Sequence, residues 1–135
     1  MLFTDTMTVY NHYTTASTDK WNRTVIRGVQ WRHNKVLTNV SQNLMSRDVV
    51  ESITVDFKGA YVGNKTYVTP EAFKNLADKS DYWTLNTDGL DVIVYGASTT
   101  EITTSPKDLS GRVTVREVAD NRNRTFLKNI KVVAK

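Results

Sequence analysis

Residues 51–57 read ESITVDF, and polar and apolar side chains alternate strictly along this stretch. A period of two places Ile53, Val55 and Phe57 on one face, which is typical of a half-buried β-strand. Further short segments are rich in β-branched and aromatic residues, namely 6–13, 19–31 with a break at Gly28, 92–95, 113–118 and 126–133. A turn at residues 63–64 predicts a hairpin between 60–62 and 65–68. We therefore predict a mainly β fold, a small barrel or sandwich of about eight strands.

One segment predicts a short α-helix over residues 70–77. Thr69 offers a capping hydroxyl, Pro70 suits the first helical position, and Glu71 places an acid at the positive helix end. Phe73 and Leu76 follow at helical spacing. A helix of about two turns needs tertiary packing to be stable. We expect Trp83 to pack on it and so to anchor it to the barrel.

Residues 34–49 read NKVLTNVSQNLMSRDV and contain no glycine or proline. Their periodicity is weak, and long irregular segments are uncommon in compact domains unless they have a function. An extension of the neighbouring strands is one interpretation. We favour the other, a long loop that projects from the barrel.

The length of 135 residues predicts a single domain, residues 1–135. The absence of cysteine excludes disulfides, thiolate zinc sites and a cysteine nucleophile. The two histidines, His12 and His33, lack a metal-binding spacing, and we interpret Asp81 and Asp91 as solvated loop ends rather than an acid–base pair. We expect no enzyme activity, no metal and no cofactor. The N-terminus does not resemble a signal peptide, and no apolar run is long enough for a membrane span.

The charge distribution is uneven around a net charge of +4. Residues 71–101 contain six acids against two lysines, whereas residues 112–135 contain seven bases against two acids. Three interpretations remain: solvated faces, nucleic-acid binding by the basic flanks, or docking of the acidic middle on a neighbour's basic flank. For the third, the candidate subunit-interface residues are Asp81, Tyr82, Asp88, Arg112, Arg116, Arg122 and Arg124.

The pair Tyr82-Trp83 lies between acidic residues, which would repel nucleic-acid phosphates from a stacking platform. Adjacent side chains of an extended chain point to opposite faces, so only one of the two belongs in the core. The larger and less polar Trp83 is the core candidate. Tyr82 is then the candidate for a subunit edge.

The order of these features resembles a known family. The segments are DTMTVYN (5–11), KWNRTV (20–25), GVQW (28–31), YVTPEAF (67–73), DKSDYWTL (78–85), DNR (120–122) and the closing VVAK (132–135). This pattern is similar to the minor capsid or neck proteins of tailed phages and prophages, in particular head-closure (stopper) and head–tail connector proteins. The resemblance covers nearly the whole chain.

The resemblance implies a small β-barrel that forms a homo-oligomeric ring of about six or twelve subunits between the portal–adaptor complex and the tail. Such a ring belongs to the neck of a virion assembled in a bacterial cytoplasm, extends the DNA channel and retains packaged DNA. The implied partners are portal, adaptor, tail-terminator or tail proteins and double-stranded DNA contacted without sequence preference, with no membrane. A long loop would enter the channel, and its candidate residues here are Asn34, Lys35, Asn39, Ser41, Gln42, Asn43 and Arg47.

Two alternatives stay open. A tail-terminator or tail-completion protein would also be a small barrel that assembles into a ring. A monomeric barrel that binds nucleic acid is the alternative from a different class, and the basic flanks are its support.

Overall fold

The computed structural model describes residues 4–41, 44–56, 65–102, 106, 109–120 and 129–135, with the backbone alone for 33–41, 44–50 and 56. Its described part contains one helix and eight strands. They follow the chain as β1 (Asp5–Thr15), β2 (Thr18–Ser41), β3 (Leu44–Asp56), β4 (Thr66–Tyr67), α1 (Pro70–Lys74), β5 (Tyr82–Trp83), β6 (Val92–Tyr95), β7 (Val113–Asp120) and β8 (Asn129–Ala134).

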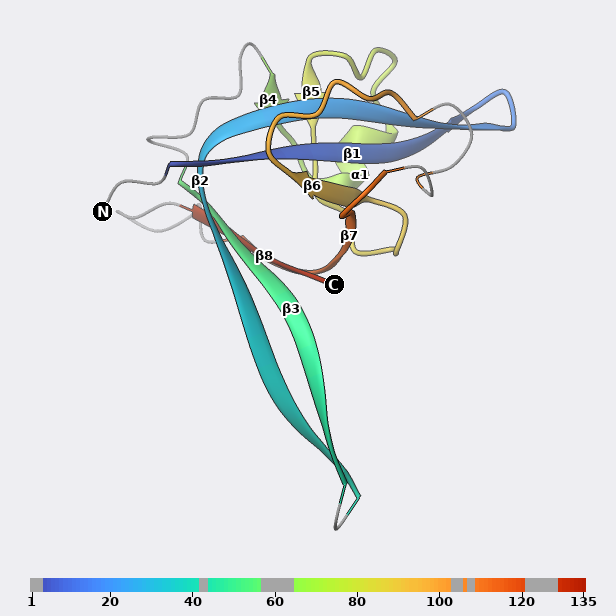
Figure 1. Ribbon diagram of the computed structural model, residues 1–135. Coiled ribbons are helices and arrows are strands. Elements are labelled where there is room, and N and C mark those ends of the chain that lie inside the picture. Colours follow the sequence, from blue (N-terminus) through green and yellow to red (C-terminus); the bar gives the residue numbers. More distant parts are fainter. Residues whose placement is uncertain (1–3, 42–43, 57–64, 103–105, 107–108, 121–128) are drawn as a thin grey trace.

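Six of the strands form a closed antiparallel barrel in the order β1-β2-β3-β8-β7-β6, with β6 also paired to β1 (Figure 1). The longest pairing in the barrel wall joins β1 to β2, from Thr15↔Thr18 to Asp5↔Val29. The shortest is the seam between β6 and β7, where only Val92↔Thr114 and Ile93↔Val113 are paired. A mainly β fold with one short helix is therefore confirmed.

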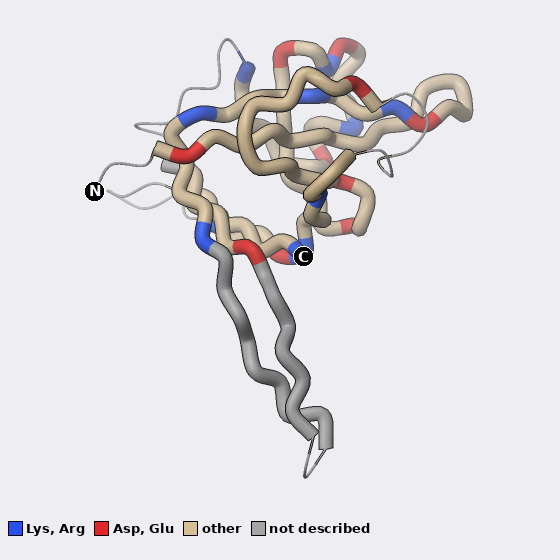
Figure 2. The backbone as a smooth tube through the Cα atoms, in the orientation of Figure 1, with Lys and Arg blue, Asp and Glu red and all other residues tan. Residues whose placement is uncertain are grey.

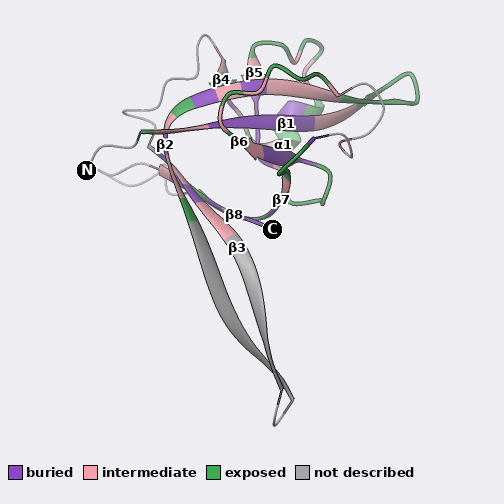
Figure 3. Cartoon of the chain, in the orientation of Figure 1, coloured by how far each residue is buried: buried purple, intermediate pink, exposed green. Residues whose placement is uncertain are grey.

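Figure 3 shows buried positions along the barrel strands, with a continuous buried stretch in β1. In β3 and β8 the buried positions alternate. Ile53 and Val55 of the ESITVDF stretch are fully buried, as their alternation predicts, and Phe57 lies outside the described residues. In β8 the buried residues are Ile130, Val132 and Ala134, again at a period of two. This core also includes Met7, Val9, Ile26, Val29, Tyr67, Trp83, Leu85, Ile93 and Val115.

Strand β1 is buried on both faces, from Met7 to Asn11. A second, smaller cluster of Tyr10, Val92 and Leu109 covers the face opposite the main core. The Tyr10 hydroxyl donates to the Thr100 carbonyl at 2.7 Å and shares a hydrogen bond of 2.8 Å with the Ser98 hydroxyl, so the segment after β6 lies against β1. Because both faces of this stretch are covered, its polar residues such as Thr8 are buried together with the apolar ones.

Helix α1 begins as predicted but ends earlier. The Ala72 N–H donates to the capping Thr69 Oγ1 at 3.3 Å, and Pro70 is the first helical residue. The helix ends at Lys74, and Asn75 forms its C-terminal cap, so the predicted extent to residue 77 is wrong. The Asn75 and Leu76 N–H groups donate to the Ala72 and Phe73 carbonyls at 3.2 and 3.3 Å, and these i→i−3 bonds tighten and close the last turn, so Leu76 and Ala77 lie beyond the helix.

Strands β4 and β5 form a separate two-stranded parallel sheet, Thr66↔Tyr82 and Tyr67↔Trp83. The Trp83 side chain is fully buried and its ring meets Tyr67 edge-on, with ring centroids 4.9 Å apart. The prediction that Trp83 is the core member of the pair is confirmed, and Tyr82 is half-buried. The first half of the hairpin predicted around residues 63–64 lies outside the described residues.

Two positions in the β1–β2 hairpin have unusual backbone conformations. The turn residues Ala16 and Ser17 have φ of 50° and 64°, a left-handed geometry that favours glycine or asparagine. Gly28 has φ of 84°, next to a register shift of β1 between Asp5 and Thr6. The predicted break at Gly28 is thus an irregularity in pairing, and β2 continues through it.

Beyond the barrel, β2 and β3 continue as a two-stranded ribbon (Figure 1). Pairing of β1 with β2 ends at Val29 and pairing of β8 with β3 ends at Glu51, whereas β2 and β3 pair with each other as far as Ser41↔Leu44. We call residues 33–50 the arm. The predicted long loop that projects from the barrel is confirmed, and its two sides are paired strands, continuous with β2 and β3.

Candidate functional site

The arm is fixed to the barrel rim by Trp31 at its base. The Trp31 indole N–H donates to Glu51 Oε2 at 2.6 Å, and the ring lies edge-on to Tyr95 with centroids 5.3 Å apart. Asp5 accepts from the Trp31 backbone N–H at 3.0 Å and from the Tyr95 hydroxyl at 2.9 Å. The bond to Asp5 raises the pKa of Tyr95 above its ordinary value. These contacts fix the direction in which the arm leaves the barrel.

The predicted channel-loop residues lie in the arm. Asn34, Lys35, Asn39 and Ser41 belong to β2 and Arg47 to β3, while Gln42 and Asn43 lie outside the described residues. The register pairs Lys35 with Val49, Leu37 with Arg47 and Asn39 with Met45. Directly paired residues share a face of a ribbon, so Lys35, Asn39 and Arg47 belong to one face. Asn34 belongs to the other.

A second feature is the segment between β5 and β6, which is held on β1 by a buried polar network. Asn11 Nδ2 donates to Asp91 Oδ2 at 2.8 Å, and Asn11 Oδ1 accepts from the Thr84 N–H at 3.1 Å. Asp91 also accepts from the His12 N–H at 2.9 Å and the Asn86 N–H at 3.0 Å. The interpretation of Asp91 as a solvated loop end is therefore wrong, because its side chain is a buried acceptor for three donors.

Burial has a clear effect on the Asp91 carboxyl, which is 2% exposed. Removal from water disfavours the ionised form and raises the pKa of Asp91 to about 6, although the three hydrogen bonds act in the opposite direction. Asp81, its partner in the same prediction, is exposed as expected.

Next to this network, a cavity of about 330 Å³ opens between the end of β1 and α1. Its lining includes Tyr13, Phe73, Lys79, Thr84 and Leu90. The Lys79 ammonium lies 5.5 Å from the Tyr13 ring centroid and 5.6 Å from that of Phe73. A second hollow of about 310 Å³ shares Tyr13 and Lys79 and extends toward Lys20 and Asn22.

Acidic and basic positions are spread along the barrel backbone (Figure 2), and the predicted interface residues belong to two separate segments of the chain. Asp81 and Asp88 are exposed beside α1, and Arg112 and Arg116 are exposed around the start of β7. Tyr82 is half-buried, because Asn22 Nδ2 donates to its carbonyl at 2.9 Å and holds this segment on β2. Arg122 and Arg124 lie outside the described residues.

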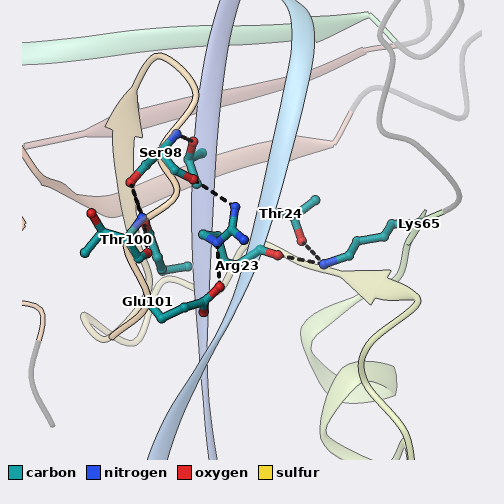
Figure 4. Close-up of polar contacts among 8 residues, drawn as sticks. Arg23, Thr24, Lys65, Ser98, Thr100 and Glu101 are labelled. Carbon is teal, nitrogen blue, oxygen red and sulfur yellow. Dashed lines mark hydrogen bonds and ion pairs between the residues drawn. The ribbon is translucent and has the colours of Figure 1, made fainter. Parts of the chain in front are cut away.

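A polar cluster on the outside of β2 holds two further segments in place (Figure 4). Arg23 donates to Glu101 Oε1 at 2.8 Å and to the Ser98 carbonyl at 2.8 Å. Lys65 donates to the Arg23 carbonyl at 2.7 Å and to Thr24 Oγ1 at 2.9 Å. Burial, followed by the nearby charge of Arg23, lowers the pKa of Lys65. The donors of this cluster are bonded to protein acceptors, which is typical of a structural role.

Sequence reasoning did not find Asn11, Asp91 or Lys79 as members of sites. The only local signal is that Asn11 continues the apolar face of an alternating strand, where an amide needs a buried partner. In the part of the chain that the structure describes, no cluster of three or more histidine, aspartate or glutamate side chains could hold a metal. No described helix has the length and apolar character needed to span a membrane.

Comparison with known proteins gives one match. No curated protein and no solved structure is detectably similar to the chain. A family model matches residues 2–135, nearly the whole sequence. The barrel, its arm and the polar networks described above all fall within that span. The chain therefore belongs to the family of unknown function DUF6751.

Proposed function

We propose that this protein is a structural neck component of a tailed bacteriophage or phage-derived particle. In this proposal it forms a head-closure ring between the portal–adaptor complex and the tail, extends the DNA channel and retains packaged DNA. The observation that carries the proposal is the arm, a paired β-ribbon that leaves a closed barrel at a fixed rim. A ring whose subunits each present such an arm can place them around a common axis.

The distribution of charge over the barrel supports head-to-tail contacts. In a closed barrel of this strand order, β1 lies across from β8 and β2 across from β7. The segment 69–91 has four exposed acids against two lysines, besides the buried Asp91, and it is bound to β1 through Asn11 and to β2 through Asn22. The described parts of 109–135 contain four bases against two acids. The acid-rich segment 69–91 and the base-rich strands β7 and β8 are thus on opposite walls, an arrangement that supports head-to-tail contacts between successive subunits of a ring.

The composition of the arm supports contact with DNA that is independent of sequence. Lys35 and Arg47 share one face of the ribbon. Asp48 is the only acid within the arm. Two cations on a narrow ribbon, repeated around a ring, would neutralise phosphates without reading bases. Retention of DNA should therefore weaken as salt concentration rises.

Whether the protein assembles into a closed ring is the direct test of the proposed function. Sedimentation velocity and negative-stain electron microscopy of the protein, alone and mixed with portal–adaptor or tail complexes, should detect a closed ring. Reversing Asp81 and Asp88 to arginine should disrupt it, and so should reversing Arg112 and Arg116 to aspartate. Combining both pairs of reversals should restore assembly, because the complementary charges are exchanged between the two faces.

The combined variant is the matched control, since it carries all four substitutions but keeps opposite charges in contact. Thermal melting of every variant shows that the barrel is intact. The assembly defect should be largest at low salt, where surface charges act over longer distances. A protein that stays monomeric with every one of these complexes would refute the proposal. Binding to tail proteins but not to portal–adaptor complexes would indicate a tail terminator instead.

A further inference from the structure

The cavity beside β1 has apolar walls and a charged mouth. Tyr13, Pro70, Phe73 and Leu90 contribute the apolar surface, and Leu90 is 44% exposed although it is a large apolar residue. A volume of about 330 Å³ is at the small end of the range for ligand sites, enough for one amino-acid-sized group.

The acids of this cavity already have donors. Asp91 accepts from His12, Asn11 and Asn86, and Asp88 Oδ1 accepts from the Leu90 N–H at 3.0 Å. Neither carboxylate needs a ligand to satisfy its charge. These carboxylate oxygens are therefore largely occupied by hydrogen-bond donors of the protein itself.

The cationic side of the cavity has no carboxylate partner among the described residues. Lys79 is half-buried and donates to the Leu76 carbonyl at 2.8 Å, but no described carboxylate forms an ion pair with Lys79 or with Lys74. The Thr84 hydroxyl is buried in the same lining and has no hydrogen-bond partner among the described residues. The partly buried Lys79 ammonium is thus available to an incoming acceptor, and the Thr84 hydroxyl in the same lining is a buried donor that lacks an acceptor.

We propose that this cavity binds an apolar carboxylate, either a free small molecule or the C-terminal residue of a partner chain. The carboxylate would accept from Lys79 and Thr84, and the apolar part would lie against Tyr13, Phe73 and Leu90. A cationic ligand fits less well, because the Lys79 ammonium already lies over both aromatic rings. This site goes beyond the neck function and does not depend on it.

The test is an NMR titration of the full-length protein with N-acetyl-phenylalanine, and with N-acetyl-phenylalaninamide as the neutral probe of the same shape. The carboxylate should shift amide signals of residues 12–14 and 84–91 and should bind about tenfold more tightly than the amide. Lys79→Met should weaken carboxylate binding by about tenfold and leave amide binding unchanged. Lys20→Met is the matched control, because Lys20 lines only the second hollow.

Equal binding of the acid and the amide, or unchanged binding to Lys79→Met, would overturn the proposal. If Lys79→Met does not fold, Lys74→Met on the exposed side of α1 tests the same charge and should weaken carboxylate binding severalfold. A hexapeptide ending in phenylalanine distinguishes the two sources. Tighter binding than the single amino acid identifies the end of a partner chain, and weaker binding identifies a small molecule.

Discussion

Asp91 should make the stability of this protein depend on pH in the direction opposite to that of an ordinary paired carboxylate. Burial raises its pKa from 3.8 to about 6 in the folded protein. The folded state therefore holds the Asp91 proton more tightly than the unfolded chain. This contribution to stability is fully present below about pH 3.8 and is lost as the pH rises through about 6.

The expected change in the free energy of unfolding follows from the pKa values of Asp91 in the folded and unfolded states. A rise of about two units corresponds to about 3 kcal/mol between the protonated and the fully ionised limits. Between about pH 4.5 and about pH 7 the change is about 2 kcal/mol, because part of the proton has already left the unfolded chain at the lower pH. Other carboxylates also titrate in this range, so only a comparison between variants isolates Asp91.

Urea unfolding followed by tryptophan fluorescence at several pH values between 4.5 and 7.5 provides the assay. Asp91→Asn cannot ionise, so its free energy of unfolding should lack this loss of about 2 kcal/mol toward neutral pH. It also loses acceptor capacity for the His12, Asn11 and Asn86 donors, which lowers its stability at every pH. Asp81→Asn, at an exposed position whose charge does not act on Asp91, is the control and should keep the wild-type slope.

Identical pH slopes for the wild type and Asp91→Asn would refute this reasoning. The midpoint can also be measured without mutation, from the side-chain carboxyl signal of Asp91 in an NMR titration. A midpoint near pH 4 would show that the three hydrogen bonds outweigh burial.

Three further predictions concern the fold and the arm. Trp83→Ala should lower the free energy of unfolding by about 3–5 kcal/mol because the indole is fully buried, whereas Tyr82→Ala should spare the isolated barrel and damage assembly, as thermal melts and ring formation will show. Replacing Ala16-Ser17 by Asn-Gly should raise the free energy of unfolding by about 1 kcal/mol or more in urea titrations, because both residues have left-handed φ; no change would mean that the turn is unstrained. Replacing residues 35–49 by Asn-Gly, which joins the paired Asn34 and Val50, should keep the melting temperature near that of the wild type but release packaged DNA in a nuclease-protection assay; loss of folding would make the arm part of the core.

The strands could be predicted where burial is one-sided. Ile53 and Val55 alternate with polar residues because only one face meets the core, and the same period identifies β8. The arm shows no such alternation, since it extends past the barrel core and no barrel strand pairs with its outer edges. That is the physical reason why periodicity predicts a projecting loop here but not the extent of its paired strands.

The candidate site was harder to predict, because its contacts join distant parts of the chain. Asn11 and Asp91 are 80 residues apart in sequence, and an aspartate beside a glycine turn looks solvated until its partner is known. The same holds for Lys79, whose aromatic neighbour Tyr13 comes from β1. Periodicity reports which face of an element is buried, but not which polar groups meet inside.

The end points of strand pairing have a consequence for how this family can diversify. Pairing of the barrel with the ribbon stops at Val29 on one strand and at Glu51 on the other. Insertion or deletion of two residues on each strand of the arm would preserve the side-chain alternation of both strands and leave every barrel pair untouched. Each such step changes the reach by about 6–7 Å. Arm length is thus a dimension that evolution or an engineer can adjust independently of the barrel.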